Sequence, residues 1–183
     1  MNNSTFLVEH NRLMGDLKTA LQSDIARIAI DANGGRSILF VYPPIDEEAY
    51  IAEARQQLEN CMFIDLRELF VKFIDETGID DFKESYQDFG NELFVSKNFE
   101  EGTFLSMILS EIKKAFDEGK VPVLIHTGTI YGMGFSNIHI MEQDFVMNSS
   151  IPLVVFYPAT IENNQIVFLG KQVASRYRCV VVK

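Results

Sequence analysis

The chain has 183 residues, of which 47% are hydrophobic and 23% charged, a composition typical of a single globular domain over residues 1–183. Its net charge of −10 opposes direct binding to a nucleic-acid phosphate backbone. The chain has no apolar run of roughly 18 residues and no secretory signal, which argues against a membrane protein. Its two cysteines lack the spacing of zinc ligands. We therefore expect free thiols in a reducing cytoplasm, and no metal or cofactor.

Predicted helices and strands alternate along most of the chain. Apolar residues at three- and four-residue steps predict one N-terminal helix over residues 1–30, ended by two glycines. The same spacing predicts further helices over residues 47–59, 67–77, 104–118 and 137–146. Short apolar runs predict strands over residues 37–42, 61–66, 121–126, 151–157, 165–169 and 178–182. Residues 79–102 are acidic and aromatic, and we expect a helical insertion there.

This alternation predicts a three-layer α/β domain with a mostly parallel central sheet and helices on both faces. The last strands follow each other without helices, which predicts an antiparallel edge at the C-terminal end, and Glu162-Asn163-Asn164 suits a hairpin turn there. In such sheets ligands bind beyond the carboxyl ends of the strands. A phosphate-binding loop would follow the first strand and would need glycines and a lysine. This chain has Pro43 and Pro44 at that position, followed by acidic residues. ATP hydrolysis of the P-loop type is therefore excluded at this position.

Two side chains at predicted strand ends are weak catalytic candidates. His126 ends the third strand and is a possible general base, although no nucleophile is paired with it by motif, which favours a structural histidine. Asp65 ends the second strand, where it could bind a metal or a hydroxyl group, but a cap for the following helix is favoured.

A glycine-rich loop follows the third strand and is a candidate for binding a ligand or a partner. The alternative is an ordinary strand–loop–helix connection, and this alternative is favoured because no established phosphate-loop spacing occurs. The candidate residues of this loop are Thr127, Gly128, Tyr131, Ser136 and Asn137.

Two further segments are candidate docking surfaces for a protein. One is the basic cluster Arg176-Tyr177-Arg178, for which the alternative is a charged edge that prevents aggregation. The other consists of the aromatic residues of the acidic insertion, for which the alternative is a lid packed on the sheet. Its candidate residues are Phe82, Phe89 and Phe94.

Several short motifs, taken together in order, resemble the BrxB family of small proteins from BREX bacteriophage-exclusion operons. An apolar strand ends in Tyr-Pro followed by acids, a second strand runs into Asp-Leu and a leucine-rich helix, and a third runs into Thr-Gly, an aromatic residue and Ser-Asn. A fourth strand ends in Phe-Tyr-Pro, and Leu-Gly and Tyr-Arg follow. These motifs occupy residues 40–48, 63–69, 124–137, 154–158 and 168–178.

The resemblance implies a non-catalytic accessory or adaptor subunit in a phage-defence complex, docked on a larger subunit such as a PglZ-like protein. It also implies a sheet similar to an AAA-like nucleotide-binding core that lacks the phosphate loop. The alternative is a small enzyme or a nucleotide or ligand sensor with its site around His126. The sequence favours the adaptor over the enzyme and makes direct nucleic-acid binding the weakest interpretation.

Overall fold

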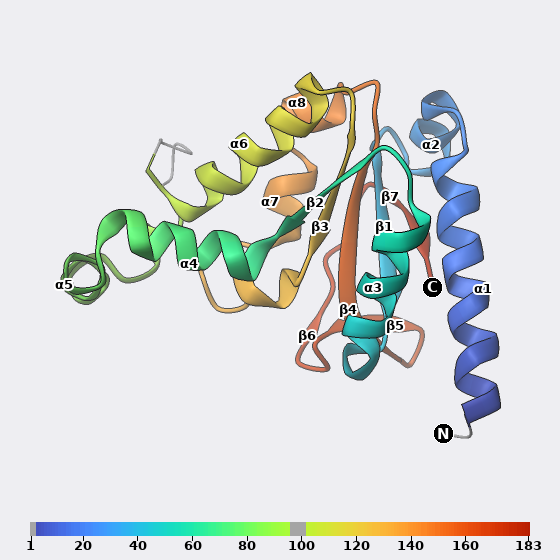
Figure 1. Cartoon of the computed structure of the whole chain (residues 1–183), viewed down its shortest axis with the longest axis horizontal. Coiled ribbons are helices and arrows are strands. Elements are labelled where there is room, and N and C mark those ends of the chain that lie inside the picture. The colour runs from blue at the N-terminus through green and yellow to red at the C-terminus, as the bar shows by residue number, and fades with distance from the viewer. Residues whose placement is uncertain (1–2, 96–101) are drawn as a thin grey trace.

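The computed structural model describes residues 3–95 and 102–183 and shows a sheet between two layers of helices (Figure 1). The strands are β1 (Ser37–Tyr42), β2 (Cys61–Asp65), β3 (Val121–Ile125), β4 (Leu153–Glu162), β5 (Gln165–Phe168), β6 (Gln172–Val173) and β7 (Cys179–Val182). The longer helices are α1 (Asn3–Leu21), α3 (Glu47–Gln57), α4 (Leu66–Thr77), α5 (Ile79–Phe89) and α6 (Phe104–Asp117). The shorter helices are α2 (Ile25–Asp31), α7 (Asn137–Met141) and α8 (Asp144–Met147), with 3-10 turns η1 (Pro44–Asp46), η2 (Gly90–Leu93) and η3 (Thr127–Ile130).

Five parallel strands form the sheet in the order β2-β3-β4-β1-β7, and β5 and β6 extend it antiparallel from the end of β4. The predicted α/β class, the mostly parallel sheet and the antiparallel extension are confirmed. The first strand lies inside the sheet between β4 and β7. All six residues of β1 are buried, as expected for a strand covered on both faces.

Alternate residues of the strands point into two separate cores, because side chains of a strand alternate between the faces of a sheet. On one face, Phe40 and Tyr42 pack with α1, α2 and α3 around Leu17 and Tyr50. On the other face, Leu39 packs with α4, α6, α7 and α8. Figure 1 shows these two layers, with α1 and α5 at opposite ends of the molecule.

Three predicted elements differ from the structure. The predicted N-terminal helix over residues 1–30 is two helices, because Asp24 caps α2 by accepting a hydrogen bond from the backbone N–H of Ala26 at 3.0 Å. The predicted helix over 137–146 is likewise divided into α7 and α8. The last strand, β7, is not part of the antiparallel extension: it pairs parallel with β1. In the predicted insertion at 79–102, residues 96–101 lie outside the described residues.

The hairpin between β4 and β5 has the turn that the sequence predicts. Glu162 pairs with Gln165, and the two residues between them, Asn163 and Asn164, have φ angles of 50° and 63°. A two-residue turn of this kind needs positive φ at both positions, and asparagine tolerates that conformation better than most residues. The short polar turn therefore sets the register of the antiparallel extension.

Candidate functional site

The carboxyl ends of β2 and β3 bring the two catalytic candidates together. These strands are parallel neighbours and pair Asp65 with Ile125, so Asp65 stands beside the residue that precedes His126. Both side chains are buried, with 6% and 4% of their surface exposed. Nδ1 of His126 lies 2.9 Å from Oδ1 of Asp65. The sheet therefore forms an acid–imidazole pair from residues 61 positions apart in the sequence.

Two further charged side chains complete this group, which we call the His126 network: Glu48, Asp65, Arg67 and His126. Nε2 of His126 lies 3.2 Å from Oε1 of Glu48, which reaches over from the first turn of α3. Arg67 donates a hydrogen bond to Glu48 at 3.1 Å and lies 3.6 Å from the second carboxylate oxygen of Asp65. The network thus ties α3, β2, α4 and the end of β3 to one another.

The backbone at His126 is in the left-handed region, with φ 54° and ψ 41°. This conformation costs an L-residue roughly 1–2 kcal/mol, so the surrounding contacts must hold it. The carbonyl of His126 accepts a hydrogen bond from the Thr129 hydroxyl at 2.8 Å. The turn directs the imidazole toward Asp65 and Glu48.

The carboxylate of Asp65 caps α4, which is the role that the sequence analysis favours for this residue. Oδ1 accepts a hydrogen bond from the backbone N–H of Arg67 at 3.0 Å. Burial by itself raises the pKa of the Asp65 carboxyl. The hydrogen bonds and charges of His126 and Arg67 outweigh burial and place this pKa below its ordinary value. Asp65 therefore joins the helix cap to the His126 network.

The end of β1 carries an acidic turn where a nucleotide-binding domain would place its phosphate loop. Pro43 and Pro44 lead into η1, and the buried Tyr42 donates a hydrogen bond to Oε1 of Glu47 at 2.7 Å. Burial raises the pKa of Tyr42, and the charge of Glu47 adds to this effect, so the phenol stays protonated. The local charge is unfavourable for a phosphate and favourable for a cation.

As a chemical unit, the His126 network offers an imidazole with a carboxylate at each nitrogen. Such an arrangement orients the imidazole ring. Within residues 3–95 and 102–183, no three His, Cys, Asp or Glu side chains are placed to hold a metal ion. Thr127, next to His126, is buried and its hydroxyl donates a hydrogen bond to the carbonyl of Phe156 at 2.5 Å. That contact gives Thr127 a structural role between β3 and β4.

The other candidate loop residues surround a separate small cavity. Tyr131, Ser136 and Asn137 line it together with Tyr157 and Tyr177, whose hydroxyls lie 3.0 Å apart. Its volume of about 30 Å³ leaves room for a water molecule or two. The structure therefore brings Tyr177 of the basic cluster to the glycine-rich loop, whereas Gly128 packs elsewhere, near Leu169.

The basic cluster is divided between different surroundings. Arg178 forms an ion pair with Glu142 on α7–α8 at 3.2 Å, Arg176 is exposed, and Tyr177 is half-buried. Arg178 therefore fastens the segment before β7 to the helical layer. Arg176 and Arg178 both remain exposed, so the docking role of this cluster stays a prediction.

The aromatic residues of the insertion also differ from each other. Phe94 is buried and packs on Phe70 and Tyr86 with ring centroids 6.0 and 5.7 Å apart, so it belongs to the core. Phe82 is partly buried in the same aromatic group. Phe89 alone of the three candidates is largely exposed, at 59%. Phe94 therefore fits the interpretation as a lid packed on the core, whereas Phe89 is still available to a docking partner.

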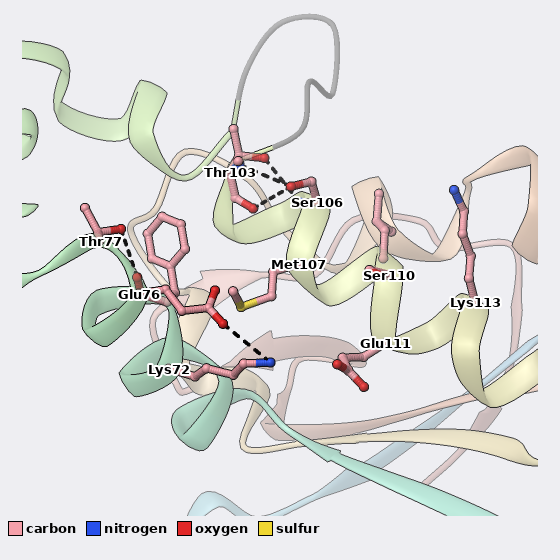
Figure 2. Close-up of a pocket in the computed structure, with 12 residues that line it drawn as sticks. Lys72, Glu76, Thr77, Thr103, Ser106, Met107, Ser110, Glu111 and Lys113 are labelled. Atoms are coloured by element: carbon pink, nitrogen blue, oxygen red, sulfur yellow. Dashed lines mark hydrogen bonds and ion pairs between the residues drawn. The ribbon is translucent and has the colours of Figure 1, made fainter.

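A groove between α4 and α6 has a volume of about 730 Å³ (Figure 2). Figure 2 shows Lys72 on α4 and Glu111 on α6 projecting from opposite walls, with Lys72 3.7 Å from Glu76. Buried Phe73 and Leu109 contribute to its lining. The sequence analysis missed this groove, because periodicity identifies the apolar face of each helix but not the distance between two helices.

Comparison of the chain with known protein families, curated proteins and solved structures found no match. Among the described helices, none combines the length and the apolar character needed to cross a membrane.

Proposed function

We propose that this protein is a non-catalytic adaptor subunit that binds a larger protein partner. The observation that carries the proposal is α5, an amphipathic helix of 11 residues in which no residue is buried. A helix with an apolar side ordinarily buries that side against its own domain. On α5, Phe82 packs against the second core, but Ile79, Tyr86 and Phe89 on the same side stay largely exposed. This exposed part of α5 is therefore available to another protein.

The exposed side of α5 has the chemistry of a docking surface. Ile79, Tyr86 and Phe89 are 54%, 47% and 59% exposed, and their spacing places them along one side of the helix. Aromatic residues are enriched in protein interfaces. The helix also carries four carboxylates and one lysine, so a partner with a basic surface fits it best. In Figure 1, α5 stands at the end of the molecule away from α1, where a large partner has access.

The similarity to the BrxB family supplies the partner for this proposal: a PglZ-like protein of a BREX-type phage-defence complex. Support comes from the order of the motifs. It also comes from the place of β1 inside a parallel sheet, combined with the acidic, proline-containing turn after it. An adaptor with such a sheet has no need for a phosphate loop.

The test is purification of the tagged chain, expressed from its native operon, at moderate salt. We expect a PglZ-like protein to co-purify in a fixed stoichiometry. The double variant Ile79→Ser/Phe89→Ser should retain at least ten-fold less partner, because both side chains leave the docking surface, while thermal stability stays the same.

Val173→Ser is the matched control, since Val173 is 54% exposed on β6 and lies outside α5. It should retain the partner fully. Elution of the wild-type chain alone would contradict the adaptor function. Full retention by the double variant would contradict the role of α5.

A second candidate function is a ligand site at the His126 network, favoured by the burial of an Asp–His pair at the carboxyl ends of parallel strands. A ligand there would stabilise the folded state and raise the melting temperature. A thermal-shift screen with nucleotides, divalent metals and small amines tests this function. A shift lost in His126→Gln would support it, and no shift with any compound would argue against it.

A further inference from the structure

The edge strand β2 is open on the side away from β3. It is the first strand in the order β2-β3-β4-β1-β7, and the described residues place no other strand beside it. Exposed edge strands carry unpaired backbone N–H and C=O groups, which pair readily with another extended chain. A partner that pairs with these backbone groups must therefore supply a segment of extended backbone.

The sequence of β2 lacks the usual protection of an edge. Its residues are Cys-Met-Phe-Ile-Asp, with neither lysine nor proline. Cys61, Met62 and Phe63 are all only half-buried, and Met62 and Phe63 belong to opposite faces of the sheet. An added strand would cover both faces at once. At the other end of the sheet, α1 and α2 pack against β7.

A groove continues from this edge into the molecule. A cavity of about 220 Å³ lies along β2 and is lined by Met62, Ile64 and Glu68 among others. It shares Lys72 and Glu111 with the groove of about 730 Å³ between α4 and α6 (Figure 2). A segment paired with β2 could therefore place its side chains, or its continuation, between these helices.

The charge along the edge indicates the composition of the segment. The lining of the cavity beside β2 has three carboxylates, from Asp65, Glu68 and Glu111, and one ammonium group, from Lys72. Asp65 is paired with His126, and Lys72 lies 3.7 Å from Glu76. Glu111 lies 3.8 Å from Lys114, and the guanidinium of Arg55 lies 5.1 Å from the centre of the Phe63 ring. Carboxylates still outnumber the ammonium group in the lining of this cavity, and Glu68 forms no ion pair with the described residues, so the cavity favours a basic segment. A net charge of −10 on each copy disfavours pairing of two copies of this chain.

We propose that β2 is a docking edge that binds an extended, basic segment of a protein partner by adding it to the sheet as a further strand. The proposal rests on the adaptor function, because it names the segment that an adaptor would hold. In this mode backbone hydrogen bonds supply affinity, and alternate side chains supply specificity.

The probe is an end-blocked synthetic hexapeptide of alternating lysine and valine, added to the isotope-labelled full chain. We expect amide chemical-shift changes centred on Cys61 to Ile64 and at least five-fold slower amide exchange there. A peptide with N-methyl groups at alternate positions cannot complete the strand and should not produce these effects.

Glu68→Lys and Glu111→Lys should each weaken binding of the hexapeptide at least three-fold. Asp117→Lys is the matched control, because Asp117 is an exposed carboxylate on α6 that does not line the groove, and it should bind the peptide as the wild type does.

Shifts located elsewhere, equal binding of the methylated peptide, or no binding would overturn the proposal. A dimer with protected β2 amides in the free chain would also overturn it in favour of self-pairing. Co-purification of a partner without protection of the β2 amides would support the adaptor function and contradict the role of this edge. Peptide binding at β2 with no co-purified partner would support the edge and contradict the adaptor function.

Discussion

His126 combines burial, a left-handed backbone and two carboxylate neighbours in one position. Such residues persist where the surrounding structure holds them, and they cluster at functional sites. Here Asp65 and Glu48 face the imidazole, and Arg67 compensates the excess of negative charge. The chain therefore uses this histidine at least as a connection between α3 and α4.

Stability in acid is expected to depend on Asp65. Its pKa in the folded state lies below the ordinary value of about 3.9 that an unfolded chain retains. Its contribution is therefore complete above that value and is lost as pH falls through the folded-state pKa. Asp65→Asn should cost about 1–3 kcal/mol at pH 7, since it leaves buried groups less well paired.

Chemical denaturation of both proteins between pH 7 and pH 3 measures this effect. The difference between wild type and Asp65→Asn should shrink as pH falls below about 4. A difference that is constant over the whole range would show that the charge of Asp65 does not contribute to folding.

Among the elements, the start of β1 and the segment before β7 make an unusually close backbone contact. A Cβ built on Gly35 would lie 1.7 Å from the carbonyl oxygen of Arg178. The adjacent Gly34 has φ +90° but nothing within 4 Å of its Cβ position. The two glycines of one turn thus serve different purposes, close approach at Gly35 and backbone conformation at Gly34.

This difference predicts different effects for the same substitution. Gly35→Ala should destabilise the fold by about 3 kcal/mol, because backbone must move to accept the methyl group. Gly34→Ala should cost about 1 kcal/mol from its left-handed conformation alone. The midpoints of urea denaturation of the two variants provide the comparison. Equal effects would mean that β1 and the Arg178 segment can separate without cost.

For the whole molecule, stability depends on two cores that share one sheet. The first core joins α1, α2 and α3 to β1 and β4, and the second joins α4 and α6 to the opposite face. Leu17 of α1 is fully buried in the first core, although α1 lies before the first strand of the sheet and could have been a separate N-terminal extension. The N-terminal helix is therefore part of the domain and not an appendage.

Truncation of one α1 side chain tests this integration. Leu17→Ala should lower the free energy of unfolding by about 3 kcal/mol through lost burial and a residual cavity. Leu7→Ala is the control, because Leu7 is 55% exposed on the same helix, and it should change stability by less than about 0.5 kcal/mol. Loss of only α1 helicity, with one later transition for the remainder, would contradict a single cooperative unit.

Local patterns determined much of this protein. The buried run of β1, the Asn163-Asn164 turn, the cap at Asp65 and the proline-containing turn after β1 were all predictable, because each depends on a few consecutive residues. The division between α1 and α2 was missed, although Asp24 supplied a capping signal, since apolar periodicity continued across it.

Tertiary structure alone decided which of these residues meet. Strand order and helix placement decide the contact of Asp65 with His126 and the groove between α4 and α6. They also decide which apolar residues of α5 stay exposed and that the edge of β2 is open. Periodicity states which face of an element is apolar but not which neighbour covers it. The same limit explains Phe89 and Phe94, two aromatic residues of one segment, of which one is exposed and the other lies in the core.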